Sequence, residues 1–465
     1  MVSKIKVELS PVTRISGLMT VEAVVDKNKV KEARVMGTMY RGFEIMMQGR
    51  KTEDAPYFTE RICGICSLAH GLVSTYAVEK AYAVKVSEPV QMLRNILLGF
   101  ELLQNHLRHF YLLGLPDFVE SRALPFQPQN GRDYRFNMGE TQRLVNNYYQ
   151  AIEISRLCHE SIAIFGGKAP HNHGIVAGGV SVAPRSDLVL KARSNLQKVN
   201  TFLRDGLARD VDLLARRYED YFRLGAGPGN FLSFGLLPLT PSGNPVLPSG
   251  VYYHGKAHPL DIEAIVTDIK YSWFTQEDHE TVPDPDKPGA YTWVKAPRYK
   301  GLVMEVGPLA RGVVAGIYPP RSSTMDRIVA RAYETIQVGD IMAQWLDTIK
   351  LENQVDWKVK PKGELVNPVS VGATEVLRGS LYHRLKTEGD NVLEYDVITP
   401  SEWNFSPRDQ NHRPGAAETA LTGLPVAKID RPVEIYRTVR SFDPCISCAT
   451  HLLTPEGSLQ RFVME

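Results

Sequence analysis

The sequence predicts one α+β domain over residues 1–465 that is mainly helical, with a central bundle of long helices. Three observations lead to this prediction. Residues 4–35 alternate apolar and polar side chains, and several later segments carry long runs with a helical period. The stretches between those runs have the composition of surface loops and not of flexible linkers. We therefore expect a small N-terminal antiparallel sheet, a helical bundle and irregular loops.

The first elements follow from local patterns. Residues 4–35 combine alternation with β-branched side chains, which predicts two or three strands. From Ile65 onward the period becomes helical. Residues 66–84 contain strong helix formers, and the helix predicted over 88–115 opens with Glu88 and Pro89, a typical helix start.

Three more long helices are expected further along, over roughly 139–164, 185–221 and 325–350. No block of like charges interrupts them, which favours a bundle core. Residues 223–250 are rich in Gly, Pro and Ser, and residues 276–299 contain "DHETVPDPDKPGAY". Both stretches are therefore expected to be irregular.

Composition narrows the possible partners. Lys plus Arg number 54 and Asp plus Glu number 52, so the formal net charge is +2 and no nucleic-acid partner is expected. The first residues lack the continuous apolar region of a secretory signal, and the longest charge-free apolar stretches are too short to cross a bilayer. We expect a polypeptide without its own membrane segment, which a partner could still hold at a membrane.

Four of the five cysteines form two Cys-x-x-Cys pairs, each followed by a histidine. Cys63 and Cys66 precede His70 in "ERICGICSLAH", and Cys445 and Cys448 precede His451 in "DPCISCATH". The first pair lies at the predicted start of a helix, where unpaired N–H groups and the helix dipole favour thiolate over thiol. Four thiolates gathered in a protein interior need cations, so the pattern indicates a metal site.

Spacing alone leaves several kinds of site open. A structural zinc, an Fe–S cluster and a disulfide shuttle would each use such pairs. Structural zinc usually staples a short segment, whereas these pairs come from opposite ends of the chain. Arg61, His70 and Asp443 lie close to the cysteines in sequence and could support bound ligands. Cys158 lies among apolar residues at helical spacing and is interpreted as a core cysteine.

The two cysteine motifs resemble the signature motifs of the large subunit of nickel–iron hydrogenases. Five further stretches resemble motifs of that family in the same order: "SPVTRISG" (10–17), "GTMYRGFE" (37–44), "GGKAPH" (166–171) with "AGGV" (177–180), "TEVLRGSLYH" (374–383) and "ITPSEWNFSPRD" (398–409). The resemblance covers nearly the whole chain and implies the fold of those subunits.

The resemblance implies a Ni–Fe(CN)2(CO) centre. By this correspondence all four motif cysteines bind nickel, and Cys63 and Cys445 are terminal ligands. Cys66 and Cys448 bridge nickel to an iron that carries one CO and two cyanides.

The resemblance also implies roles for residues around that centre. The guanidinium of Arg378 would hang over the metals and pair with Asp443. Ser401 would donate a hydrogen bond to a cyanide, with Pro400 lining the same pocket. His70 would hydrogen-bond near a bridging thiolate. Separately, Glu44 and His451 would bind Mg2+ away from the nickel. Without the motif, Arg378 would be interpreted as a surface ion-pair residue.

Two positions depart from the family pattern. Many relatives have Glu where this chain has Ser16, and that carboxylate is regarded as the first proton acceptor beyond the terminal thiolate. A serine can relay a proton only through hydrogen bonds, so Glu60 is considered as a substitute. Many relatives have Asp where this chain has Asn105. We therefore expect Arg378 to be held mainly by Asp443.

The implied activity is reversible heterolytic cleavage of H2 to protons and electrons. Since Cys158 alone cannot hold a cluster, electrons would leave through a small subunit that carries Fe–S clusters. An H2 sensor with little turnover, a scaffold protein of the kind that lacks these cysteines, and a structural zinc protein are the alternatives.

The resemblance further implies how the protein is matured and where it works. A maturation endopeptidase would remove residues 452–465 once nickel chaperones have delivered the metal. The protein would fold in the cytoplasm. Export with a small subunit that carries a twin-arginine signal, and association with a membrane cytochrome b through that subunit, would follow in some enzymes of this kind.

Overall fold

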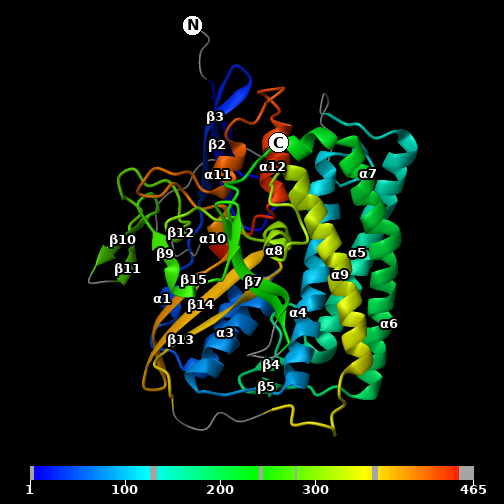
Figure 1. Ribbon diagram of the computed structural model, residues 1–465, viewed down its shortest axis with the longest axis vertical. Helices are drawn as coiled ribbons and strands as arrows, with labels where there is room; N and C mark the ends of the chain where they lie inside the picture. Colours follow the sequence, from blue (N-terminus) through cyan, green and yellow to red (C-terminus); the bar gives the residue numbers. More distant parts are fainter. Residues whose placement is uncertain (1–4, 126–132, 240–244, 278–279, 359–364, 450–465) are drawn as a thin grey trace.

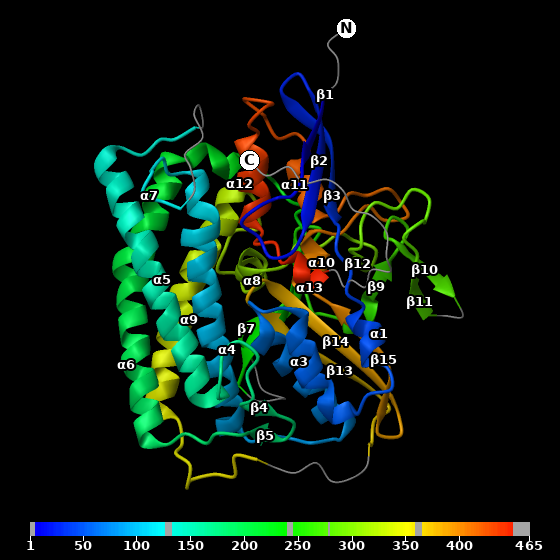
Figure 2. The same ribbon diagram turned by 180° about the vertical axis from the view of Figure 1, so that it is seen from behind.

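The structure is a computed structural model that describes residues 5–125, 133–239, 245–277, 280–358 and 365–449. One side of the molecule is the predicted helical bundle, whose long helices lie side by side in both views (Figure 1, Figure 2). Its members are α4 (Glu88–Arg108), α5 (Met138–Gly166), α6 (Ser186–Phe202), α7 (Arg209–Arg217) and α9 (Thr324–Thr348). The bundle confirms the predicted fold class.

The bundle helices begin where the sequence supplies caps. Asn137 accepts a hydrogen bond from the Glu140 backbone N–H, and Glu140 reciprocates at Asn137, so α5 starts with a capping box. Ser323 caps α9 by accepting from Asp326 N–H. The helix predicted over 185–221 is interrupted after Phe202 by a π-helical turn, and a second such turn follows Arg108.

The predicted N-terminal sheet is present. It consists of β1 (Ile5–Leu9), β2 (Met19–Asp26) and β3 (Lys29–Gly37), paired antiparallel in that order. Its apolar face packs on α11 (Ala416–Leu421) and α12 (Val433–Ser441) and forms a second hydrophobic core. The alternation of residues 4–35 is therefore explained, because one face is buried and the other is solvated.

A six-stranded mixed sheet lies beside the bundle and was not predicted. Its order is β15 (Asn391–Ile398), β14 (Gly379–Glu388), β13 (Val369–Val376), β6 (Phe231–Pro238), β7 (Pro245–Tyr253) and β8 (Lys256–His258). The expectation that 223–250 is irregular was wrong, since β6 and much of β7 lie there. Nearly every side chain of β6 is buried, so its sequence lacks the alternation that identifies a half-exposed strand.

The shorter elements complete the fold. The remaining strands are β4 (Ile175–Val176), β5 (Gly179–Val180), β9 (Ile265–Asp268), β10 (Phe274–Glu277), β11 (Glu280–Pro283) and β12 (Ala296–Tyr299). The expectation that residues 276–299 are irregular was wrong in part, because they contribute strands to two antiparallel two-stranded sheets, β10–β11 and β9–β12. The remaining helices are α1 (Phe43–Met47), α2 (Ala55–Thr59), α3 (Ser67–Ala81), α8 (Pro308–Val314), α10 (Pro400–Asn404) and α13 (Ile446–Ala449).

The centre of the molecule is the place where these parts meet. Helix α3 packs on β13 and β14, and the short helix α13 lies against α10 between the bundle and the sheets (Figure 2). Within the described residues, none of the helices has the length and apolar content needed to cross a membrane. The two cysteine motifs lie at the N-terminal ends of α3 and α13.

A buried ion cluster fixes the β13–β14 turn against the bundle. Arg311 on α8 donates to both oxygens of Glu334 on α9 at 2.6 Å and to Glu375 on β13 at 2.5 Å. It also donates to the carbonyls of Val376 and Leu377, at 2.9 and 3.3 Å. These contacts hold the two residues that precede Arg378 in the turn.

Replacing Arg311 with Met should destabilise the protein, because two buried carboxylates would lose their cation. Breaking a buried ion pair costs about 3–5 kcal/mol, and the midpoint of denaturant unfolding should fall accordingly. The control is Arg156→Met, which removes an exposed arginine paired with Glu153 and Glu160 on α5. Equal unfolding midpoints for the two variants would contradict a structural role for the cluster.

Candidate metal centre

Four cysteine sulfurs from the two ends of the chain meet at one buried point. The Sγ atoms of Cys63, Cys66, Cys445 and Cys448 all lie within 4.8 Å of one another, and none of them forms a disulfide. The closest approaches are 3.4 Å between Cys63 and Cys445, 3.2 Å between Cys66 and Cys448, and 2.8 Å between Cys445 and Cys448. Sulfurs that bind one tetrahedral metal at about 2.3 Å lie about 3.8 Å apart, so the group as a whole has the size of a site for one metal, although Cys445 and Cys448 are closer together than that.

The first motif holds its cysteines at a helix start. Cys63 is extended after a turn at Glu60–Ile62, and Cys66 immediately precedes α3. The Ile65 N–H lies 3.4 Å from the Cys63 sulfur and donates to it. The backbone thus supplies a donor to this sulfur, but it comes from the loop before the helix, because the N–H groups of Leu68 and Ala69 in the first turn of α3 donate to Glu101.

The second motif is held by the N-terminal segment. Ile446 N–H donates to the Ser16 carbonyl at 2.7 Å, and Ser16 N–H donates to Pro444 at 3.3 Å. Next to it, a Cβ on Gly17 would lie 2.4 Å from the Ser447 nitrogen, so only glycine fits there, and φ is +85°. The motif "SPVTRISG" therefore supports the cysteine loop directly.

The thiols differ in their acidity. Burial raises the pKa of Cys66 and Cys448. At Cys445 burial acts in the same direction, but hydrogen bonds from the other three thiols and the charge of Arg378 outweigh it and lower the pKa. Negative charge in the cluster is therefore stabilised by hydrogen bonds and by a neighbouring guanidinium.

Arg378 lies in the tight turn between β13 and β14 and is only 4% exposed, so it is not a surface residue. Its Nε donates to the Asp443 carbonyl and lies 3.1 Å from the Asp443 carboxylate. Its Nη2 reaches Asn105 Oδ1 at 3.4 Å, so Asn105 shares the contact with Asp443. Among the described residues, Nη1 is buried and has no hydrogen-bond partner. Burial acts to lower the pKa of Arg378, but Asp443 and the cysteines raise it well above the usual value.

Ser401 and Pro400 lie on α10, which begins with a capping box between Thr399 and Glu402. The Ser401 hydroxyl oxygen accepts from Cys445 N–H at 3.0 Å. The hydroxyl hydrogen has no recorded acceptor in the described part of the chain. Ser401 therefore holds the backbone of Cys445 in place, and its O–H group lies beside Cys445 as a hydrogen-bond donor.

His70 begins a buried hydrogen-bond chain that sequence analysis missed. Its Nδ1 lies 3.1 Å from His383 Nε2, and His383 Nδ1 lies 2.8 Å from the Tyr395 hydroxyl. That hydroxyl donates to Ser74 at 2.8 Å. Burial lowers the pKa of His70 to about 4, with Cys445 acting against the shift. The only signal in the sequence was that His383 closes the motif "TEVLRGSLYH".

The expected magnesium ligands are only partly described. Glu44 lies on α1 and forms an ion pair with Lys295 at 2.7 Å. It also accepts from Val397 N–H at 3.0 Å. His451 lies outside the described residues. The structure brings Glu44 to β15 and to Lys295 but leaves the second ligand undescribed.

Three further polar residues lie next to the cysteine segments. Ser16 donates to the Ser447 hydroxyl at 2.9 Å, next to Cys448. Glu60 is buried and accepts from Asn172 at 2.7 Å, and burial raises its pKa to about 8 although Arg61 opposes the shift. Glu101, which sequence analysis did not select, accepts from two backbone N–H groups in the first turn of α3 at 3.0 Å. Burial raises the pKa of Glu101 to about 8.

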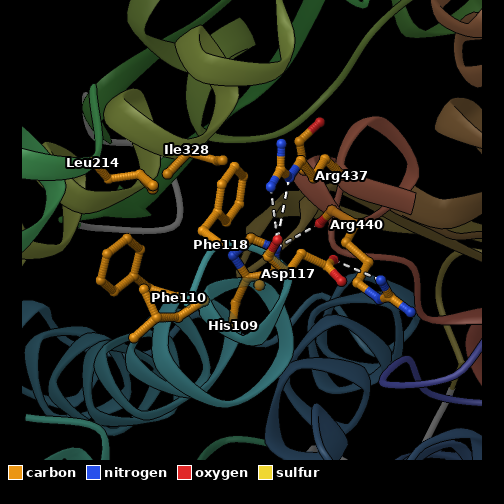
Figure 3. A pocket seen from close by; sticks show the side chains of 11 residues that line it. His109, Phe110, Asp117, Phe118, Leu214, Ile328, Arg437 and Arg440 are labelled. Carbon is orange, nitrogen blue, oxygen red and sulfur yellow. Dashed lines mark hydrogen bonds and ion pairs between the residues drawn. The ribbon is translucent and has the colours of Figure 1, made fainter. Parts of the chain in front are cut away.

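A small apolar pocket lies beside the π-helical turn that follows α4 (Figure 3). Its polar rim is already paired, because Arg440 contacts Asp117 at 2.6 Å and Arg437 donates to the Asp117 carbonyl at 2.8 Å. The His109 ring contacts the Arg440 carbonyl at 2.6 Å. The pocket offers apolar surface but no free acid or base, and the four cysteines are not part of its lining.

His106 and His258 have structural roles. His106 is a buried core residue that contacts Thr335 and the Leu377 carbonyl, at 2.9 and 3.0 Å. His258 lies on a strand and stacks on Tyr253, with 4.3 Å between ring centroids. By contacting Leu377, His106 also supports the turn that carries Arg378.

Comparisons with known proteins agree over almost the entire chain. The family model "Nickel-dependent hydrogenase" matches residues 41–134, 124–318 and 317–451. The large subunit of the periplasmic [NiFeSe] hydrogenase of Desulfomicrobium baculatum is 34% identical, and the match covers 99% of this chain and 97% of that protein. The uptake hydrogenase large subunit of Bradyrhizobium diazoefficiens is 29% identical, with 97% and 96% covered.

Solved structures give the same result. The reduced Ni-Fe-Se hydrogenase of D. vulgaris Hildenborough superposes with a TM-score of 0.91 at 37% identity, covering 97% of this chain and all of that one. The H2-activated [NiFeSe] hydrogenase of Dm. baculatum superposes with a TM-score of 0.92 at 34% identity. In the present chain all four clustered side chains are cysteines, so they offer sulfur and not selenium.

Replacing Cys445 with Ala should remove most of the metal from the purified protein, because one of four converging thiolates is lost. We expect at least a tenfold drop in metal per chain, since even changes outside the ligand set cost about 10–100-fold in affinity. Elemental analysis would measure it. Cys158→Ala is the matched control, because this cysteine is buried in α5 and belongs to no cluster. Equal loss in both variants would contradict the site.

Proposed function

Because the chain belongs to the nickel-dependent hydrogenase family and is the large, catalytic subunit of such an enzyme, we propose that its four buried cysteines hold a nickel–iron centre. The activity is the activation of H2, cleaved reversibly into protons and electrons. The observation that carries the proposal is the convergence of sulfurs from both ends of the chain, with an arginine beside them.

Two buried hydrogen-bond donors without acceptors in the described part of the chain favour the proposal that the iron carries CO and cyanides. Arg378 Nη1 is buried without a partner, and the Ser401 hydroxyl hydrogen lies beside Cys445 without an acceptor among the described residues. Buried polar atoms are rarely left unpaired, so both positions fit small anionic ligands. When bound, the centre would supply the redox chemistry that converts H2 into two protons and two electrons.

The protein's own residues would orient the site and handle protons. Asp443 and Asn105 fix two nitrogens of the Arg378 guanidinium and leave the third available. A cysteine thiolate would hold the first proton, with the Arg378 guanidinium beside it as a hydrogen-bond donor, because a guanidinium whose pKa is raised stays protonated. Onward transfer would use the Ser16–Ser447 hydroxyl pair, or Glu60, whose raised pKa of about 8 permits uptake of a proton near neutral pH.

A second subunit is required for the electrons. With four of the five cysteines in the cluster, Cys158 alone cannot hold an Fe–S centre. We propose an Fe–S small subunit as a permanent partner, and through it a membrane cytochrome b as an electron acceptor. Maturation would use nickel chaperones and an endopeptidase. The relative from Desulfomicrobium baculatum is named periplasmic, which supports folding in the cytoplasm followed by export with a twin-arginine small subunit.

A magnesium ion is proposed for the second site, with Glu44 and His451 as ligands. Support comes from the half-buried Glu44 carboxylate, whose present cation is Lys295. None of the relatives reported above is named as a sensor, so we do not propose an H2 sensor. We do not propose a non-catalytic scaffold protein either, because such a protein lacks the four cysteines that cluster in this chain.

The purified heterodimer should contain nickel and reduce a viologen dye with H2. Arg378→Lys should keep its nickel but lose about 100-fold or more of its turnover, because lysine cannot replace a planar guanidinium at this position. Arg384→Lys on the same hairpin, where the arginine pairs with Asp396 near the surface, is the control and should retain activity. Zinc in place of nickel, with no H2-dependent reduction, would refute the proposed function.

Removal of residues 452–465 should accompany nickel insertion. The mature chain should then be 14 residues shorter (465 minus 451) and end at His451. Intact mass spectrometry would measure this. In Cys445→Ala, which should lack nickel, the full-length mass should persist. A nickel-loaded, active chain that still ends at Glu465 would show that no cleavage occurs.

A further inference from the structure

Arg41 lies between the two cysteine segments and contacts both. It follows β3 in the motif "GTMYRGFE" and precedes α1. Its Nη2 donates to the Ser447 carbonyl at 2.6 Å and also to the Ile62 carbonyl. Its Nη1 lies 3.3 Å from the Arg61 carbonyl. One guanidinium therefore joins two loops that come from opposite ends of the chain.

Two of these carbonyls belong to the residues immediately before a cysteine. The Ile62 carbonyl belongs to the peptide bond that leads into Cys63, and the Ser447 carbonyl belongs to the one that leads into Cys448. A peptide unit is planar, so a hydrogen bond to its oxygen also restricts the Cα to which the cysteine side chain is attached. Arg41 thus constrains one cysteine from each motif.

The other supports of the site reach only one loop each. Ser16 and Ser401 bind the second motif, and Glu101 binds the backbone behind the first. Apart from the cysteines themselves, Arg41 is the described side chain whose recorded hydrogen bonds reach both motifs. Without it, no other side chain in the described part of the chain would join the two loops by hydrogen bonds, and the sulfurs and apolar packing would remain.

Arginine is suited to this position. Its fork of donors is planar and rigid, so one Nη can serve two carbonyls while the other serves a third. The guanidinium carbon lies 4.8 Å from the centre of the Phe43 ring, which restrains the plane. Gly42, at φ +66°, makes the left-handed turn between Arg41 and α1.

We propose that Arg41 is a positioning residue that sets the separation of the two halves of the metal site. This inference rests on the proposed function, because the site it shapes is the proposed nickel site. Arg41 touches neither substrate nor sulfur in this role. It holds the two cysteine loops at the same separation whether or not the metal is bound.

The test compares Arg41→Gln and Arg41→Lys with wild type and with Arg50→Gln, each purified as the heterodimer. Arg50 is the matched control, because it also bonds a carbonyl and lies over a phenyl ring, but it contacts neither cysteine loop. Three quantities are measured: nickel per large subunit, the line width of the nickel electron paramagnetic resonance signal, and H2-dependent turnover per nickel.

Arg41→Gln should lower nickel occupancy about tenfold, as for loss of a supporting contact. The remaining nickel should give a broadened resonance and a reduced turnover per nickel with an unchanged KM for H2. Arg41→Lys should be intermediate, since an ammonium group can hold one loop but not both. Arg50→Gln should match wild type.

Full nickel, an unchanged resonance and normal turnover in Arg41→Gln would overturn the inference. Should that variant fail to fold, Arg41→Lys decides, and a spectrum and occupancy identical to wild type would overturn it equally. Absence of nickel from the wild-type heterodimer would instead refute the proposed function, so the two failures are distinguishable.

Discussion

The structure depends on one electrostatic requirement: four thiols from opposite ends of the chain share a space less than 5 Å across in the protein interior. Unpaired negative charge is costly to bury, so the surroundings must supply positive charge and hydrogen-bond donors. Arg378 provides charge, and the N–H group of Ile65 donates to the Cys63 sulfur. The packing of the rest of the chain brings these groups into place.

Each part of the fold contributes one side of the site. The bundle and the Arg311 cluster fix the turn that presents Arg378, while α10 supplies the oxygen that fixes Cys445. The N-terminal segment holds the second cysteine loop through the backbone of Ser16. None of these contacts is between neighbours in sequence. The site is therefore a product of tertiary structure, although its ligands lie in two short motifs.

This explains what the sequence could and could not predict. The half-buried N-terminal sheet, the long helices and the paired cysteines all leave local signals, namely alternation, period and spacing. Strand β6 is almost completely buried and leaves no alternation, and its glycine- and proline-rich surroundings favoured an irregular interpretation. The chain from His70 through His383 to Tyr395 depends on the packing of α3 against β14 and β15, which no local pattern encodes. Likewise, nothing near Glu44 in the sequence points to Lys295.

Gly17 has a consequence for the order of events during biosynthesis. Because Gly17 has no side chain, the segment that connects β1 to β2 lies directly against the backbone of residues 446–447. Residue 17 is synthesised long before residue 447, so the N-terminal half of this contact is made first and stays without its partner while more than four hundred residues are added (447 minus 17). The group of four sulfurs is therefore completed late, by the segment that the ribosome adds after nearly all of the fold around it.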